Sequence, residues 1–454
     1  MKQYDLIVIG AGSGLDVATN AANNGWKVAI VEKGPMGGTC LNRGCIPSKM
    51  LIHCADVAYG IDQAKKFGIE TKGYKVDWEG IINRVNGVVD SDSDAILKYI
   101  ESMDNLDLYN EEGKFIDKKI IQVGNYSITS PRIVIAAGTR PAIPDIDGIN
   151  NIDFMTSKEA LRQTNQPKHL VILGGGYISC ELAHFYGSLG TEITILQRNI
   201  LLVPGEDYEL AKKYTDIYKQ RFNVYVGITT ELIEKENNII VVHYKDQTGK
   251  KRKVTADQLL VATGRVSNSD ILNTAEAGIE LNEKGYIETD EFMRTNVDGI
   301  WAFGDIAGKY FFKHSANQES IYLNYNLFND KHPAPVDYSA MPHAIFGSPQ
   351  IAGVGQTEEE LNKLGIDFKV GRCVFRDTGM GDALLDDHGL VKVLADHEGT
   401  ILGCHIIGPE ASTLIHEPIL AMKAGLKVDA ISYMIHVHPA LSEVIERAFA
   451  DIGN

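Results

Sequence analysis

Short runs of apolar residues that end in glycine-rich turns are the most regular pattern of the chain. Leu6–Ile9 and Val28–Val31 are apolar at every position, as expected for parallel strands that are covered on both faces. Between them, Gly10-Ala11-Gly12-Ser13-Gly14 opens an amphipathic helix that extends to about Asn24. The order strand, helix, strand predicts a βαβ unit at the start of the chain.

The same order of elements returns further along the chain. His169–Leu173 is a second apolar run, Gly174-Gly175-Gly176-Tyr177-Ile178-Ser179 opens the next helix, and Glu192–Leu196 is the following strand. Each unit is also followed by a strand that ends in a glycine turn. In the first lobe this is the strand Arg132–Ala136 with the turn Ala137-Gly138-Thr139, and in the second it is the strand Leu259–Ala262 with the turn Thr263-Gly264-Arg265. We therefore predict an α/β protein with two such lobes.

The two glycine turns predict two dinucleotide sites, because glycines there let the backbone approach a pyrophosphate at the start of a helix. The alternative is two glycine-rich turns without ligands. Glu32 follows the first turn by about 20 residues, where an acid takes a ribose hydroxyl. Leu15 stands at the third glycine position of the first turn, and Ser179 stands at that of the second. We expect Gly14 to take over the role of the glycine missing at Leu15 only in part. The predicted contacts are Gly10, Gly12, Ser13, Gly14, Glu32, Lys33, Gly174, Gly176, Tyr177 and Ile178.

Two cysteines, Cys40 and Cys45, stand five positions apart between glycines. In a regular helix their Cα atoms would lie more than roughly 7 Å apart, which is beyond disulfide reach. Gly37, Gly38 and Gly44 give the backbone freedom for a distortion, and Pro47 predicts that a helix begins near Cys45. A helix N-terminus stabilises a thiolate, so the pair is a candidate redox centre. The alternative is two buried thiols.

The stretch from Gly37 to Lys49 closely resembles the active-site segment of the flavin-dependent class I pyridine nucleotide–disulfide oxidoreductases. Within that family it is most similar to dihydrolipoamide dehydrogenase and mycothione reductase, and the resemblance spans essentially the whole chain. It implies a glutathione reductase-like fold with two Rossmann-like dinucleotide-binding domains and an α+β C-terminal dimerisation domain. Arg43 replaces a small apolar residue usual in the family, which we expect to change the surface that faces the substrate.

The resemblance also implies the domain organisation and the cofactors. Residues 1–149 and 268–333 would bind FAD, residues 150–267 would bind NAD or NADP, and residues 334–454 would form the dimer interface. Gly299–Asp305 resembles the second flavin motif, whose aspartate bonds the ribityl chain, and Lys313–Glu319 resembles the helix start beneath the isoalloxazine. The further residues expected at the cofactors are Thr39, Lys49, Ala137, Gly138, Thr139, Gly304, Asp305, Glu181, Gln197, Arg198, Gly264 and Arg265.

Six residues are implied to be catalytic. Cys45 would lie next to the flavin, and Cys40 would exchange with the substrate. Lys49 and Glu181 would pair beside the flavin, the alternative for Glu181 being a solvated helix position. His438 and Glu443 match the family's acid–base dyad, in which each histidine serves the cysteines of the other subunit of a homodimer.

The nicotinamide preference is left open by the residues after Glu192–Leu196. An acid at Gln197 would favour NAD by binding the 2′-hydroxyl, but the acid is absent and Arg198 follows. This is similar to the NADPH-using relatives, although the second arginine usual in them is replaced by Pro204. We predict that NADP(H) is accepted and that NAD(H) is the alternative.

The composition and net charge argue against several kinds of binding partner and cellular location. The net charge of −16 argues against binding to nucleic acid or anionic membranes. No apolar run approaches the ~18 residues that span a bilayer, and Met1–Asp5 runs directly into a strand without a signal peptide. Six cysteines do not make a secreted disulfide framework, so we expect a cytoplasmic protein with no metal site.

The substrate is the least constrained prediction. Dihydrolipoamide, free or on a lipoyl domain, is the first choice, and an NADPH-dependent low-molecular-weight disulfide reductase similar to mycothione or glutathione reductase is the alternative. The tail Ala450–Asn454 has no cysteine pair, which disfavours mercuric reductase and large thioredoxin reductase. A non-catalytic FAD-binding scaffold is disfavoured because Cys40, Cys45, His438 and Glu443 are all present.

Overall fold

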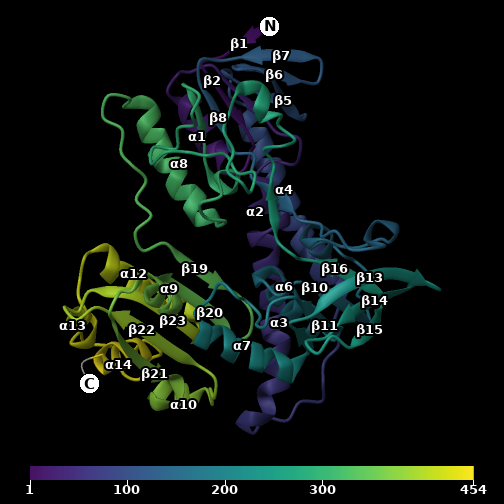
Figure 1. Ribbon diagram of the computed structural model, residues 1–454, viewed down its shortest axis with the longest axis vertical. Helices are drawn as coiled ribbons and strands as arrows, with labels where there is room; N and C mark the ends of the chain where they lie inside the picture. The colour runs from purple at the N-terminus through teal and green to yellow at the C-terminus, as the bar shows by residue number, and fades with distance from the viewer. Residues whose placement is uncertain (453–454) are drawn as a thin grey trace. The chain divides into compact units, whose positions relative to one another are not determined.

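The computed structural model describes residues 1–452, and they form two compact units (Figure 1). Unit 1 consists of residues 1–48, 82–142 and 264–338, and unit 2 consists of residues 49–81, 143–263 and those from 339 onward. Helices α3 (Cys45–Gln63) and α4 (Trp78–Glu101) each run across a unit boundary. Residues 49–81 thus belong to unit 2 rather than to the first lobe, and the assignment of three domains to cofactors and interface stays a prediction.

Unit 1 is built on a five-stranded parallel sheet in the order β18-β8-β2-β3-β4 (Figure 1). Its strands are β2 (Leu6–Ile9), β3 (Val28–Val31), β4 (Leu106–Tyr109), β8 (Ile133–Ile135) and β18 (Ile300–Ala302). Every residue of β2, β3 and β8 is buried, which explains why these strands are apolar at every position. The two strands predicted at the start of the chain are confirmed.

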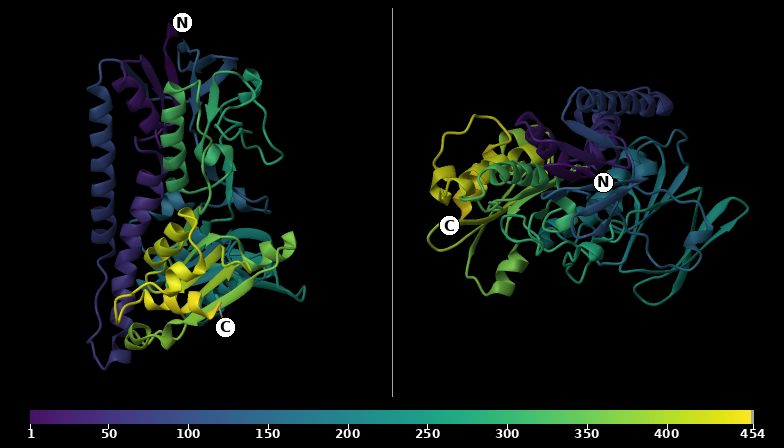
Figure 2. Two further views of the ribbon diagram at one scale, coloured as in Figure 1. Left: turned by 90° about the vertical axis from the view of Figure 1, so that its left-hand side faces the viewer. Right: turned by 90° about the horizontal axis from the view of Figure 1, so that it is seen from above.

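Both faces of this sheet are covered. Helices α1 (Gly14–Asn23) and α8 (Lys313–Phe328) pack together on one face, where Val8, Val17 and Leu323 are fully buried (Figures 1 and 2). On the other face Ile7 and Ile133 pack against Phe115 and its neighbours in a second sheet. That sheet has the order β1-β7-β6-β5 and consists of β1 (Lys2–Gln3), β5 (Gly113–Asp117), β6 (Ile120–Val123) and β7 (Tyr126–Thr129). A two-stranded ribbon joins β9 (Thr139–Pro141) to β17 (Arg265–Ser267).

Unit 2 contains the second glycine turn on a four-stranded parallel sheet in the order β12-β11-β10-β16. Its elements are β10 (His169–Leu173), α6 (Tyr177–Ser188), β11 (Glu192–Gln197), α7 (Tyr208–Arg221), β12 (Asn223–Val226) and β16 (Gln258–Val261). An antiparallel sheet of β13 (Thr229–Glu236), β14 (Ile239–Lys245) and β15 (Lys251–Ala256) completes this part. The predicted second βαβ unit is confirmed.

The C-terminal part of unit 2 is an antiparallel sheet in the order β19-β20-β23-β22-β21 with helices packed on it (Figure 2). The strands are β19 (Pro342–Ile345), β20 (Gln350–Gly355), β21 (Lys369–Val374), β22 (Leu390–Ala395) and β23 (Ile401–Gly408). Helix α14 (Glu443–Asp451) packs on β21 and β22, and α12 (His416–Lys423) packs on β23. The shorter helices are α5 (Ser157–Ala160), α9 (Glu358–Leu364), α10 (Gly379–Ala383), α11 (Ala411–Leu414) and α13 (Val428–Ser432). No helix within residues 1–452 is long and apolar enough to cross a membrane.

A buried charge cluster joins the two parts of unit 2. The side chain of Lys392 in β22 is only 1% exposed, and its Nζ lies 2.9 Å from Oδ2 of Asp207 and 2.6 Å from Oε2 of Glu358. Asp207 is the N-cap of α7, and Glu358 opens α9. Burial alone would raise the pKa of Asp207, but the hydrogen bond and charge of Lys392 lower it below its ordinary value.

We predict that Lys392→Met lowers the free energy of unfolding by about 3–5 kcal/mol at neutral pH, because it leaves Asp207 as a buried charge without its cation. Lys212→Met is the matched control: Lys212 is 58% exposed and pairs with Asp216, and its loss should change the free energy of unfolding very little, because water screens this ion pair. Urea unfolding of both variants measures the difference.

The pH dependence gives a second measurement on the same variants. The folded-state pKa of Asp207 is depressed, so its contribution is present above the ordinary aspartate pKa and is lost as the pH falls below about 4. The gap between wild type and Lys392→Met should narrow in acid, because a protonated Asp207 needs no cation. Equal losses for Lys392→Met and Lys212→Met would contradict this account.

Candidate active site and dinucleotide sites

Three glycines allow the backbone to pack closely around the first glycine turn, each at a different contact. Gly10 has φ +104°, and a Cβ there would collide with the carbonyl oxygen of Ala136. A Cβ on Gly38, whose φ is +63°, would lie 2.6 Å from Cα of Gly12. A Cβ on Gly14 would lie 2.9 Å from Cγ1 of Val8 in β2. Gly14 therefore permits the close packing of α1 on β2.

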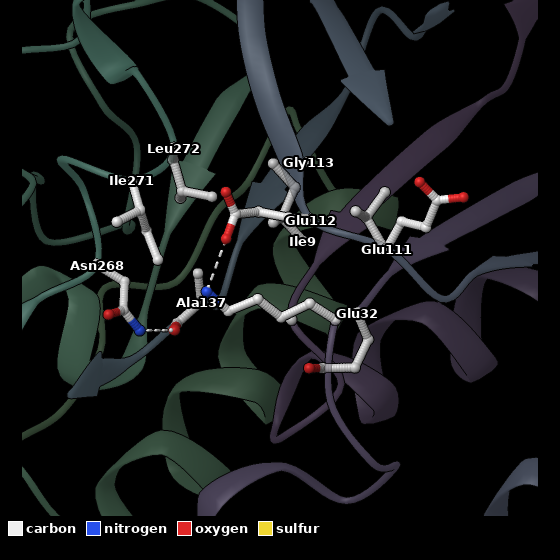
Figure 3. A pocket seen from close by; sticks show the side chains of 12 residues that line it. Ile9, Glu32, Glu111, Glu112, Gly113, Ala137, Asn268, Ile271 and Leu272 are labelled. Carbon is white, nitrogen blue, oxygen red and sulfur yellow. Dashed lines mark hydrogen bonds and ion pairs between the residues drawn. The ribbon is translucent and has the colours of Figure 1, made fainter. Parts of the chain in front are cut away.

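A pocket opens beside this turn, within unit 1 (Figure 3). The carboxylate of Glu32 accepts hydrogen bonds from the amides of Ala11 (2.8 Å) and Gly34 (2.7 Å), which fix it at the mouth of the turn. On the other side Nδ2 of Asn268 donates to the carbonyl oxygen of Ala137 at 2.7 Å. The remaining lining residues are Ile9, Gly10, Val31, Lys33, Glu111, Glu112, Gly113, Ile271 and Leu272. A fixed carboxylate beside apolar residues such as Ile9, Val31 and Leu272 suits the adenosine end of a dinucleotide.

Asp305 lies in a hydrogen-bonded group with residues from two other strands of unit 1. Oγ1 of Thr139 in β9 donates to Oδ2 of Asp305 at 2.8 Å, and Nε of Arg265 in β17 donates to Oγ1 of Thr139 at 2.6 Å. Burial raises the pKa of Asp305, while Thr139 and Arg265 oppose the rise. The buried Glu319 accepts from the amide of Gly304 at 2.6 Å and so holds the turn that carries Asp305. Arg265 thus acts in unit 1 rather than at the second glycine turn, a role that its sequence position does not reveal.

The two thiols meet at a sharp break between helices. Helix α2 (Gly38–Arg43) ends at Gly44, and α3 begins at Cys45, as predicted. A Cβ on Gly44 would lie 2.9 Å from the carbonyl oxygen of Thr39, so only glycine permits this turn. The break brings Cys45 within hydrogen-bonding reach of Cys40, and that bond together with burial raises the pKa of the Cys40 thiol. Cys40 is half-buried and Cys45 is exposed.

Lys313 is a cation beside the thiols that the sequence did not assign. It is the first residue of α8, and its Nζ donates to Oγ of Ser13 at 2.8 Å. Its charge lowers the pKa of Cys40 and so opposes the effects of Cys45 and burial. The stretch from Lys313 to Glu319 was recognised as a helix start, but the reach of the lysine toward Ser13 depends on tertiary packing.

The second glycine turn repeats the first in unit 2. Gly174 has the same φ of +104°, and a Cβ there would collide with the carbonyl oxygen of Ala262. Gly176 is the N-cap of α6 and has open space where a Cβ would be. Gln197 is 6% exposed, and its Nε2 donates to the carbonyl oxygen of Leu201. Arg198 is exposed and makes no hydrogen bond or ion pair with residues 1–452.

Lys49 and Glu181 form a close ion pair in unit 2. Nζ of Lys49 lies 2.7 and 2.8 Å from the two carboxylate oxygens of Glu181, which is 5% exposed. Glu181 is therefore not a solvated helix residue. Phe346, which the sequence did not single out, completes the group: its amide donates to Oε1 of Glu181 at 2.9 Å, and its ring centroid lies 4.6 Å from Nζ of Lys49.

His438 and Glu443 are paired at the start of the last helix. Nδ1 of His438 lies 2.8 Å from Oε1 of Glu443, and the amide of Ala440 donates to Oε2 at 3.0 Å. These two bonds lower the pKa of Glu443. The His438 side chain is 73% exposed while that of Glu443 is 9% exposed, so the carboxylate is fixed and the imidazole faces outward. The thiols lie in unit 1, whereas this dyad and the Lys49–Glu181 pair lie in unit 2.

Comparison with known proteins identifies the family. The model described as pyridine nucleotide-disulphide oxidoreductase matches residues 4–322, and that of the family's dimerisation domain matches residues 341–449. Mycothione reductase of Mycobacterium tuberculosis is 34% identical, with 99% of each chain covered. Dihydrolipoyl dehydrogenase of Chlamydia pneumoniae is 34% identical, covering 98% of this chain and 95% of its own. The solved structure of the flavoprotein disulfide reductase RclA from Escherichia coli has a TM-score of 0.89 at 28% identity, with 99% of both chains covered.

The chain belongs to the pyridine nucleotide-disulphide oxidoreductase family and has its glutathione reductase-like fold. The family uses FAD and NAD(P)H as cofactors. The residues of unit 1 fit FAD: the pocket at Glu32, the open turn at Gly12 and the Thr139–Asp305 group would hold its adenosine, diphosphate and ribityl parts. The dimerisation domain indicates a homodimer.

We predict that Phe346→Leu slows reduction of the flavin by NAD(P)H about three- to tenfold, because Lys49 loses the aromatic face that holds its ammonium group. Phe346→Tyr keeps a ring face and should stay within about twofold of wild type. Stopped-flow absorbance and the reduction potential of the bound flavin measure both variants. A tyrosine variant as slow as the leucine variant would show that the ring face is not what matters.

Proposed function

We propose that the protein is a dihydrolipoyl dehydrogenase, which passes electrons between dihydrolipoamide, the Cys40–Cys45 pair, FAD and NAD(P). The observation that carries the proposal is the meeting of Cys40 and Cys45 at the Gly44 break. A dithiol substrate that becomes a disulfide needs a protein disulfide that becomes a dithiol, and two thiols in contact on a helix N-terminus suit that exchange. The name of the Chlamydia pneumoniae relative adds support.

The exchange balances as follows. A thiolate of dihydrolipoamide attacks Sγ of Cys40 in the Cys40–Cys45 disulfide, Cys45 leaves as a thiolate, and the second substrate thiolate displaces Cys40. The substrate is oxidised by two electrons, and the protein pair is reduced by two. FAD, when bound, supplies electron transfer between the reduced pair and NAD(P). The hydrogen bond with Cys45 and burial raise the pKa of Cys40, which favours the return of a proton to that sulfur once it has been displaced.

The protons of the substrate thiols need an acceptor, and we assign that role to His438. Its exposed imidazole suits a thiol that arrives from solvent, and Glu443 fixes the tautomer that leaves Nε2 to accept the proton. In the homodimer this histidine would serve the cysteines of the other subunit, so that a monomer would lack a complete site.

His438→Ala should reduce turnover of dihydrolipoamide by roughly 10²-fold or more, the usual scale for a positioned acid–base group. Flavin reduction by the nicotinamide should stay fast in the same variant, and Glu443→Gln should cost less because it orients rather than transfers the proton. Stopped-flow separation of the two half-reactions measures each effect. Hydride transfer slowed as much as thiol exchange would rule this role out.

Subunit mixing tests the shared site in the same experiment. Cys45→Ser and His438→Ala dimers are each expected to be inactive, but a mixed dimer holds one intact site. Activity should return when the two are mixed and exchange has been shown by native mass spectrometry. Exchange without activity would contradict a site made from both subunits.

The second candidate is an NADPH-dependent reductase of a low-molecular-weight disulfide, and the observation that favours it is Arg198. Its guanidinium is exposed at the end of β11 and has no counter-ion among the described residues, as a 2′-phosphate site requires. The name of the Mycobacterium tuberculosis relative points the same way. Steady-state assays with dihydrolipoamide, glutathione disulfide and other small disulfides, each with both nicotinamides, decide between the candidates.

We predict that NADP(H) is accepted and that Arg198→Ala raises its Michaelis constant about tenfold or more, while that for NAD(H) changes less than about twofold. Only NADP(H) carries the phosphate that the guanidinium would bind. Equal changes for both cofactors would show that Arg198 does not contact the 2′-phosphate.

A further inference from the structure

Arg43 is a half-buried cation without a protein partner. It is the last residue of α2, and its guanidinium makes no hydrogen bond or ion pair with any residue that the structure describes. Two other arginines of unit 1 are paired with acids: Arg140 bonds Asp270 at 2.7 Å, and Arg294 bonds Asp290 at 2.7 Å. A guanidinium has five donors, so burying it without acceptors is costly unless a ligand supplies them.

The guanidinium lies beside Gly34 and Glu32 at the first dinucleotide site. A Cβ added to Gly34 would lie 2.7 Å from Nη2 of Arg43 and 3.1 Å from Oε1 of Glu32. Gly34 follows β3 and donates its amide to Glu32, whose carboxylate lines the pocket of Figure 3.

Helix α2 sets the direction in which Arg43 points. Its first residue, Gly38, packs on Gly12 in the glycine turn, where the phosphates of a dinucleotide are expected. Thr39 and Arg43 are four residues apart and so share a face of the helix. The guanidinium thus lies beside the carboxylate of Glu32, on a helix whose first residue contacts the phosphate turn at Gly12.

The charge of the pocket requires such a cation. Three glutamates line it, Glu32, Glu111 and Glu112, and its one lysine, Lys33, is bound to Glu112 at 2.9 Å. A diphosphate brings further negative charge to these carboxylates in a protein of net charge −16. Arg43 is the nearby cation whose donors remain available, and a guanidinium binds phosphate oxygens in a bidentate manner.

We propose that Arg43 binds the diphosphate of FAD from the adenosine side and is a determinant of FAD affinity in this protein. The proposal is independent of the thiol substrate, so it stands whether dihydrolipoamide or another disulfide is used. It requires only the family's cofactor and the position of Arg43 beside Glu32.

The test is binding of FAD, ADP and adenosine to the full-length protein stripped of its flavin, measured by titration calorimetry. Arg43→Val introduces a small apolar residue, and the dissociation constants of FAD and ADP should rise about tenfold to a hundredfold. Adenosine, which has no phosphate, should bind within about twofold of wild type. Arg43→Lys keeps the charge without the bidentate geometry and should recover part of the affinity.

Arg294→Val is the matched control, because it removes a guanidinium of unit 1 that is 52% exposed and already paired with Asp290. It should leave all three dissociation constants unchanged. As a measurement that needs no variant, ADP affinity of the wild type should weaken with salt while that of adenosine should not. Unchanged ADP binding in Arg43→Val, or equal weakening of ADP and adenosine, would overturn the proposal.

Discussion

The tight turn at Gly44 is the constraint on which the candidate active site depends. It ends α2 and starts α3 with no room for a side chain, because a Cβ would lie 2.9 Å from the carbonyl oxygen of Thr39. One backbone break thereby brings Cys40 to Cys45, places Lys49 one turn further along α3, and directs α2 back to the glycine turn at Gly12. Thiol chemistry and flavin binding are therefore positioned by the same few residues, and a substitution at Gly44 would disturb both.

The two dinucleotide sites show how one backbone frame takes different electrostatics. Gly10 and Gly174 share a φ of +104° and the same close approach to a carbonyl oxygen, so the turns are nearly equivalent in geometry. The difference lies at the end of the following strand. In unit 1 Glu32 is held by two amides as a ribose acceptor, whereas in unit 2 Gln197 is turned into the protein and Arg198 stays exposed. The shared backbone geometry suits a dinucleotide in both sites, and we propose that these residues determine which dinucleotide each site binds.

The features that the sequence predicts are those that residues close together in the chain determine. The strands β2, β3 and β10 have the predicted bounds because unbroken apolar runs with a glycine turn have few other solutions, and the start of α3 follows from Pro47. The Lys49–Glu181 pair came from resemblance, since 132 residues separate its members. Phe346, Lys313 and Lys392 escaped prediction because each acts through a contact made far along the chain, and no local pattern distinguishes them from ordinary core or surface residues. The close packing of Gly14 on Val8 is likewise visible only in three dimensions.

The way in which the buried acids are neutralised helps to assign a role to Arg198 and Arg43. The chain carries an excess of acids, and each buried carboxylate described here has its own donor or cation: Glu181 has Lys49, Asp207 has Lys392, Asp305 has Thr139, and Glu443 has His438. Arg198 and Arg43 are two cations without a counter-ion among the described residues. Arg198 directly follows β11, and Arg43 ends α2 beside Glu32; a dinucleotide would bring phosphate to each of these two regions. Their counter-ions are therefore best assigned to ligands rather than to the protein itself.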